Sequence, residues 1–95
     1  MLSGVIQFDK SPSTASKRLL SFSEKRVSIT FFPPQTGSAF LSNDPGLSAN
    51  QGMTLVAGMV PIYLDRRLQG DCVMREWFVV YGSTGTGVSW IEAMH

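Results

Sequence analysis

The chain has 95 residues, of which 43% are hydrophobic and 16% are charged, and its formal net charge is +1. This length predicts one domain over residues 1–95, and the near-neutral charge excludes any electrostatic reason to expect a polyanion or a membrane surface as partner. The charged share lies below the roughly 25% of a typical soluble domain, so we expect another molecule to cover part of the surface.

The N-terminal residues predict a short strand followed by a polar loop. Residues 4–9 form either a first strand or an extended arm laid on a neighbour, and residues 1–16 together are a possible arm and loop. Residues 10–16 are polar and carry Pro12, which is typical of a loop. Residues 1–10 lack the basic start and long apolar stretch of a signal peptide, so we expect none. No apolar run approaches the ~20 residues of a membrane helix.

The middle of the chain predicts short strands separated by turns. Residues 17–22 form a strand, residues 23–25 a tight turn, and residues 26–32 a half-buried strand. In that strand Val27, Ile29 and Phe31 share one face, and Arg26, Ser28 and Thr30 share the other. Proline cannot donate to a strand ladder, so Pro33 and Pro34 end it. Further strands are expected at 38–42, 53–56 and 60–65, with at most one helical turn at 47–51 and a charged loop at 66–71.

The C-terminal third contains both tryptophans and predicts a β-hairpin. Residues 74–81 and 87–93 are its strands, and the Gly, Ser and Thr residues at 82–86 form the turn. A hairpin alone is marginally stable, so the other strands must pack against it. The fold class is therefore all-β, a small antiparallel β-sandwich or barrel-like domain of about six to eight short strands. The residues assigned to its core are Ile29, Phe31, Ile62, Trp77 and Trp90.

No arrangement of residues predicts catalysis. The glycines of residues 82–87 have the spacing G-x-x-G-x-G with no lysine after them, which favours a turn over a phosphate loop. Cys72 is the single cysteine, so no intrachain disulfide forms, and the expected compartment is reducing. With His95 as the one histidine, Cys72 is interpreted as a small hydrophobe. We therefore expect no enzyme activity, cofactor, metal site or small-molecule substrate.

Two pairs of carboxylates could approach each other: Asp65 with Asp71 around one loop, and Glu76 with Glu92 across the hairpin. A glycosidase needs two such groups at one bond. An oxygen-only Ca²⁺ site at the first pair would lack the EF-hand spacing. The favoured interpretation is solvated surface charge, partnered by the three arginines Arg66, Arg67 and Arg75.

Basic residues occur as the pairs 17–18, 25–26 and 66–67, which raises the alternative of a small nucleic-acid-binding β-barrel. Seven acidic residues are interspersed with eight basic ones, so the positive field would be weak. Nucleic acid is not the expected partner.

From Arg26 to Glu92 the order of short motifs resembles small β-sandwich virion proteins of tailed bacteriophages. The motifs are RVSITF at 26–31, AFLS at 39–42, NQG at 50–52, LVAG at 55–58, WFVVY at 77–81 and VSWIE at 88–92. The likeness covers about two thirds of the chain and leaves residues 1–17 and 66–72 outside it.

The resemblance implies a capsid decoration (cement) protein that stabilises the head shell by protein–protein contacts. Its partners would be the major capsid protein and copies of itself in an oligomer or array, with no membrane. It would be made in the bacterial cytoplasm and act on the capsid surface of the virion. A neck, tail or fibre component is the alternative within the same class. The candidate contact residues are Phe8, Phe32, Arg66, Arg67 and Leu68.

Overall fold

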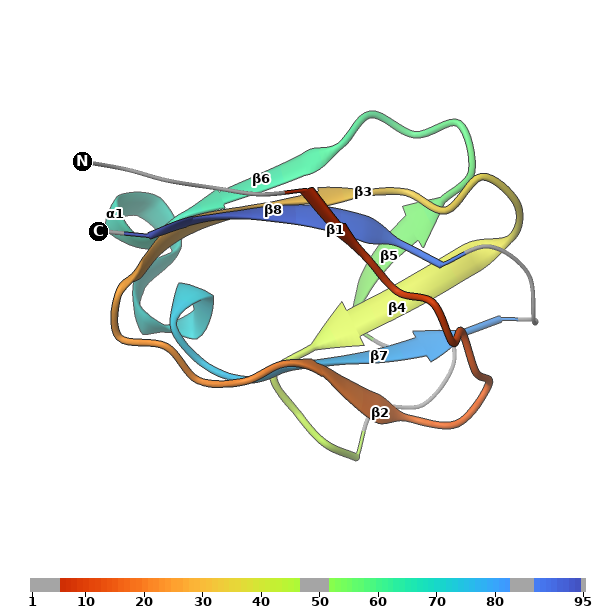
Figure 1. Ribbon diagram of the computed structural model, residues 1–95, viewed down its shortest axis with the longest axis horizontal. Helices are drawn as coiled ribbons and strands as arrows, with labels where there is room; N and C mark the ends of the chain where they lie inside the picture. The colour runs from red at the N-terminus through yellow and green to blue at the C-terminus, as the bar shows by residue number, and fades with distance from the viewer. Residues whose placement is uncertain (1–5, 47–51, 83–86, 95) are drawn as a thin grey trace.

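The computed structural model describes residues 6–46, 52–82 and 87–94. Two four-stranded antiparallel sheets pack face to face as a β-sandwich (Figure 1). This confirms the predicted all-β class. The first sheet has the order β1 (Ile6–Phe8), β8 (Ser89–Met94), β3 (Arg26–Phe32) and β6 (Ile62–Asp65). The second has the order β2 (Lys17–Leu20), β7 (Trp77–Tyr81), β4 (Ser38–Ser42) and β5 (Met53–Val56).

The core lies between the sheets and contains the residues assigned to it. Ile29, Phe31, Trp77 and Trp90 are buried, and Ile62 packs against them. The rings of Phe31 and Trp77 meet edge to face, with their centroids 5.4 Å apart, which is a favoured aromatic geometry. The core thus joins side chains from both sheets.

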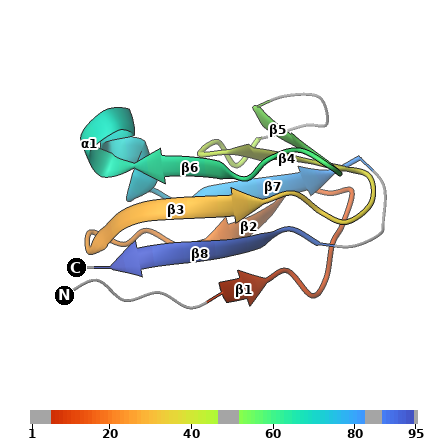
Figure 2. The same cartoon turned by 90° about the horizontal axis from the view of Figure 1, so that it is seen from above.

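The predicted C-terminal hairpin is wrong. β7 belongs to the second sheet and β8 to the first, so the chain crosses from one sheet to the other between them (Figure 2). Alternate residues of β7 and β8 face the same core from opposite sides, and this pattern is identical to that of two strands paired in one sheet. The turn expected at 82–86 lies mostly outside the described residues, as does the helical turn expected at 47–51.

The segment predicted as a charged loop at 66–71 is helical instead. The α-helix α1 (Arg66–Gln69) and the 3₁₀-helix η1 (Gly70–Val73) join β6 to β7 at one end of the sandwich. Asp65 caps α1, because its carboxylate accepts a 2.8 Å bond from Arg67 N, while Gln69 Oε1 accepts one of 2.7 Å from Asp65 N. Neither described helix is long and apolar enough to cross a membrane.

Arg26 corrects the predicted faces of β3. The β3–β8 register shifts between Arg26 and Ser28, and the buried Arg26 side chain bonds to Glu92 instead of sharing a face with Ser28 and Thr30. Its Nε donates to Glu92 Oε1 at 2.7 Å, and its terminal nitrogens donate to three main-chain carbonyls at 2.8–3.1 Å. A bulge re-aims a side chain in this way without any sign in the alternation.

Glu76 and Glu92, the carboxylates that could have met across the hairpin, have separate arginine partners. Glu92 pairs with Arg26 inside the sandwich, whereas Glu76 pairs with Arg18 at 3.0 Å on the second sheet. Asp65 is buried and pairs with Arg67, so its assignment as a solvated charge is also wrong. Strand separation explains the first result, since Glu76 and Glu92 would have met only across a true hairpin.

Candidate protein-binding face

The outer face of the first sheet presents large apolar side chains to solvent. Ile6, Phe8 and Tyr63 keep 67%, 52% and 55% of their surface exposed. The register aligns Ile6, Ile91, Thr30 and Tyr63 in one row across the four strands, and Phe8, Ser89 and Phe32 in the next row. We call the large apolar members of these two rows the apolar face: Ile6, Phe8, Phe32, Tyr63 and Ile91.

Strand alternation places these side chains outward. Gln7 is aligned with the core residue Trp90, so its neighbours Ile6 and Phe8 must point to the opposite side of the sheet. In the same way Phe31 and Ile62 point inward, and Phe32 and Tyr63 point outward. The hydrophobic core therefore fixes which residues form the apolar face.

Charge is nearly absent from this face. Among the described outward-facing strand residues of the first sheet, Asp65 alone is charged, and it is buried as the cap of α1. Depletion of charge at the centre of a surface patch is a compositional mark of protein–protein interfaces. The face thus has the chemistry of an interface core.

The outer face of the second sheet differs from that of the first in the burial of its apolar residues. Phe40 and Val80 lie in register on that outer side, yet both are buried. A bond of 3.0 Å from Ser16 Oγ to Pro45 O joins the segments beside β2 and β4, on either side of β7. The second sheet therefore covers two of its large apolar residues, although Val56 on β5 stays 43% exposed, whereas the first sheet exposes Ile6, Phe8 and Tyr63.

The size of the exposed patch limits what it can do alone. An aromatic side chain offers 150–250 Å², so Ile6, Phe8 and Tyr63 together expose roughly 300 Å². This falls in the range of the largest patches on monomers, which are often functional. It is well below the roughly 800 Å² per partner of a standard interface. One such face would bind weakly unless several act together.

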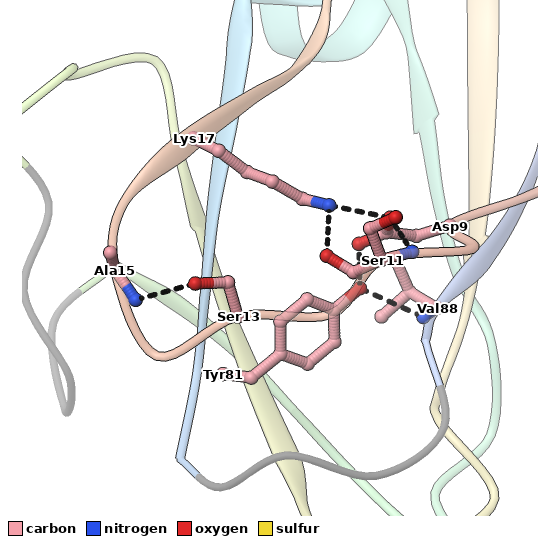
Figure 3. A network of polar contacts seen from close by, with 7 residues as sticks. All are labelled: Asp9, Ser11, Ser13, Ala15, Lys17, Tyr81 and Val88. Carbon is pink, nitrogen blue, oxygen red and sulfur yellow. Dashed lines mark hydrogen bonds and ion pairs between the residues drawn. The ribbon is translucent and has the colours of Figure 1, made fainter.

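A buried polar network holds β1 in place where the chain crosses from the first sheet to the second (Figure 3). Tyr81 Oη donates to Asp9 Oδ2 at 2.6 Å and accepts from Val88 N at 3.1 Å. Lys17 Nζ donates to Asp9 Oδ1 at 2.6 Å, and Ser11 N to the same oxygen at 3.1 Å. The Asp9 carboxylate therefore ties β1 to β2, β7 and the segment before β8.

The electrostatics of this network favour an ionised Asp9. Burial by itself raises the pKa of Asp9, but hydrogen bonds from Lys17, Tyr81 and Ser11 outweigh it and hold that pKa below its ordinary value. Burial raises the pKa of Tyr81, as does its bond to Asp9. The Tyr81 hydroxyl consequently stays protonated and donates to a carboxylate.

Close backbone packing also holds the end of β1 against the segment that enters β8. A Cβ added at Gly87 would overlap the Asp9 carbonyl oxygen and lie 2.9 Å from Asp9 Cβ. Only glycine lets the strand entering β8 approach β1 this closely. Asp9 N also donates to Val88 O at 3.0 Å, which extends the β1–β8 ladder by one residue.

The structure brings two predicted contact residues together and places the other three on α1, where Arg67 shares Asp65 Oδ2 with Tyr63 of the apolar face. Phe8 and Phe32 both flank Ser89 on the apolar face. Arg66, Arg67 and Leu68 lie on α1, beyond Asp65, which is aligned with Ser28. The Ser28 and Phe32 rows are four residues apart on β3, or about 13 Å. Leu68 is 80% exposed at this far end.

Both arginines make local contacts on the described surface. Arg67 pairs with Asp65 at 3.4 Å, and this bond raises the pKa of Arg67. The backbone bond from Arg67 and its side-chain bonds lower the pKa of Asp65. Arg66 donates to Glu24 O at 3.1 Å. These contacts cap and anchor α1 while leaving both guanidinium groups exposed.

Sequence reasoning missed Ile6, Tyr63 and Ile91 as members of the apolar face. The alternation of residues 60–65 already placed Ile62 inward, and this same signal puts Tyr63 outward. Ile6 and Ile91 needed the β1–β8 register, which no local pattern contains.

Other kinds of site are not evident in the described part of the chain. No pocket is found there, and no group of three or more His, Cys, Asp or Glu residues is placed to hold a metal ion. Comparison with protein-family models, curated proteins and solved structures finds no match to this chain.

Proposed function

We propose that this protein is a bacteriophage virion structural protein of the capsid decoration type, which binds the major capsid protein through its apolar face. The observation that carries the proposal is the exposed, almost charge-free outer face of the first sheet, bearing Ile6, Phe8 and Tyr63. The order of sequence motifs from Arg26 to Glu92 supports the virion class. The burial of Phe40 and Val80 on the outer side of the second sheet supports the choice of surface.

The size of the patch explains why arrayed binding suits this protein. Burying roughly 300 Å² at about 25 cal/mol per Å² contributes some 7 kcal/mol. The loss of translational and rotational freedom on association costs about 4–15 kcal/mol, so one isolated contact is weak. On a shell with a repeated lattice, linked copies convert weak contacts into stable attachment. The proposed protein therefore reinforces the head through many modest contacts.

The test is co-sedimentation of the purified protein with heads that lack it. A double variant, Phe8→Lys with Tyr63→Lys, should lose most head binding, because two charges would have to be buried in the contact. The matched control is Phe22→Lys, since Phe22 is 60% exposed on a loop outside the apolar face. Equal binding by the double variant and the wild type would overturn the proposed surface.

The α1 residues offer a separate measurement. Arg66→Ala with Arg67→Ala should leave the melting temperature nearly unchanged, because the Arg67 guanidinium is exposed and the Asp65 carboxylate keeps its bonds from Tyr63 Oη and Arg67 N. The same variant should weaken head binding, because Arg66 and Arg67 are among the proposed contact residues. A large loss of stability would show that these arginines are structural instead.

A further inference from the structure

We infer that β1 is a self-pairing edge, through which two copies of this chain join their first sheets into one continuous antiparallel sheet. The inference deepens the proposed function, since the capsid partner would meet a doubled apolar face. It stands on strand geometry alone and can hold if the capsid proposal fails.

The backbone of β1 presents unused polar groups to the open edge of the sheet. Asp9 N donates to Val88 O, which places Asp9 and Val88 at the position of a hydrogen-bonded pair, although Val88 N donates to Tyr81 Oη instead of to Asp9 O. Such pairs alternate along an antiparallel ladder, which makes Gln7 and Trp90 the next one. The N–H and C=O groups of Ile6 and Phe8 therefore point away from β8, toward the side of β1 on which no described strand lies (Figure 2).

The other sheet edges carry features that discourage strand pairing. On β6, Pro61 precedes the strand, and Gln69 Oε1 occupies Asp65 N. On β2, Lys17 and Arg18 bring charge, and the register is irregular before Leu20. On β5, Met59 Sδ accepts from Val56 N at 3.1 Å.

β1 lacks these protections within its described residues. Its sequence Ile-Gln-Phe has no charge and no proline, and its pairing with β8 is regular over all three residues. All three side chains are exposed. The edges at β6, β2 and β5 carry features that discourage strand pairing, and β1 does not. This contrast indicates that the β1 edge is available to pair with another strand.

The sequence of β1 is suited to pairing with itself. With a two-fold axis at Gln7, Ile6 lies opposite Phe8 of the partner subunit, and the outward backbone groups of both residues meet their counterparts. Four backbone hydrogen bonds and two aromatic–aliphatic cross-strand pairs result, each a recognised source of sheet stability. The two apolar faces then lie on the same side of the combined sheet and form one larger patch.

A three-residue pairing is small, so the dimer forms at high concentration or on a lattice that gathers copies. A disulfide trap is suited to such weak association. At the two-fold axis the two Gln7 positions form a non-hydrogen-bonded pair, with Cα atoms about 4.5 Å apart, which is within the range a disulfide spans.

The experiment uses the full chain with Cys72→Ser, so that the native thiol cannot react. Gln7→Cys in this background should give a disulfide-linked dimer under mild oxidation, with peptide mapping locating the bond between the two substituted positions. The matched control is Thr54→Cys, which places an exposed thiol on the edge strand β5. Cross-linking of Gln7→Cys no faster than that of Thr54→Cys would overturn the inference.

A second pair of variants distinguishes backbone pairing at the edge from nonspecific hydrophobic association. Ile6→Pro removes the outward N–H together with the isoleucine side chain, and it should lower the cross-linking rate of Gln7→Cys about tenfold or more. Ile6→Thr removes the same apolar side chain but keeps the N–H, so its rate should fall much less. Equal losses in both variants would contradict a backbone-paired edge. Circular dichroism checks that each variant remains folded.

The unmodified chain gives an independent readout. Sedimentation equilibrium should show a dimer fraction that rises with concentration and disappears in Ile6→Pro. A wild-type chain that stays monomeric at every concentration would also overturn the inference. Neither outcome depends on binding to heads, so failure of the dimer and failure of the proposed function are distinguishable.

Discussion

Asp9 and Tyr81 are the residues on which the placement of β1 depends. Their 2.6 Å hydrogen bond is buried, and Tyr81 Oη also accepts from Val88 N. Hydrogen bonding matters most here because a buried group left without a partner loses its hydration with no compensation.

Tyr81→Phe should lower the free energy of unfolding by about 1–3 kcal/mol, because it leaves the Asp9 carboxylate and Val88 N each short of a partner. Tyr63→Phe is the matched control: its hydroxyl also bonds to a carboxylate, that of Asp65 at 3.0 Å, but Tyr63 is exposed. Urea denaturation measures both variants. Equal losses would show that burial of the network adds nothing.

Lowering the pH should reduce the free energy of unfolding, because it protonates the Asp9 carboxylate. The folded-state pKa of Asp9 lies below its ordinary value of 3.8, so the ionised form stabilises the fold above that value. This stability is lost as the pH falls below 3.8 and through the folded pKa, because the unfolded chain takes up the proton first. Asp65, whose pKa is also lowered, adds loss in the same window.

Asp9→Asn tests the assignment. The variant should be less stable than the wild type at neutral pH, and its free energy of unfolding should fall less steeply between about pH 4 and pH 2. Denaturant titrations across that range provide the measurement. An unchanged acid slope would mean that Asp9 does not carry the effect.

At the scale of elements, local patterns predicted the strands better than their pairing. The strands at 26–32, 38–42 and 53–56 have the bounds expected from alternation and turn residues. The edges at Leu20 and Ile62 were placed two residues too far out. Pairing between β7 and β8 was wrong because a sandwich and a hairpin require the same alternation.

The candidate face was predicted only in part, for a related reason. Phe8 and Phe32 were expected to be exposed contacts, and they lie together on the apolar face. Their partners Ile6 and Ile91 depend on a register between distant segments, which one sequence does not encode locally. Arg26 shows the same limit, since one bulge reverses the side expected from alternation.

Gly87 provides a test of how β1 and β8 meet. Gly87→Ala should destabilise the fold by about 2 kcal/mol, or roughly 10 °C in melting temperature, because the added Cβ overlaps the Asp9 backbone. Gly46→Ala is the control, since its Cβ would have ordinary space, 3.4 Å from Asp44 Oδ1. Thermal melts compare the two, and a Gly87→Ala variant as stable as the control would contradict the close approach.

At the scale of the whole molecule, the outer faces of the two sheets differ in how much apolar surface they expose. The second sheet buries Phe40 and Val80 on its outer side, whereas the first leaves its apolar face open. Composition had already indicated a surface poor in charge, and the fold concentrates that property on one side. The molecule is elongated, with extents of 37, 25 and 21 Å, and its two sheets are stacked one above the other (Figure 1).

The virion assignment is tested most directly by density-gradient separation of the native source material, with this chain quantified by mass spectrometry in each fraction. We expect it to migrate with DNA-filled heads, at many copies per particle. A few copies per particle, or enrichment in tail fractions, would move the assignment to a neck, tail or fibre component. Absence of the chain from every particle fraction would contradict the virion proposal.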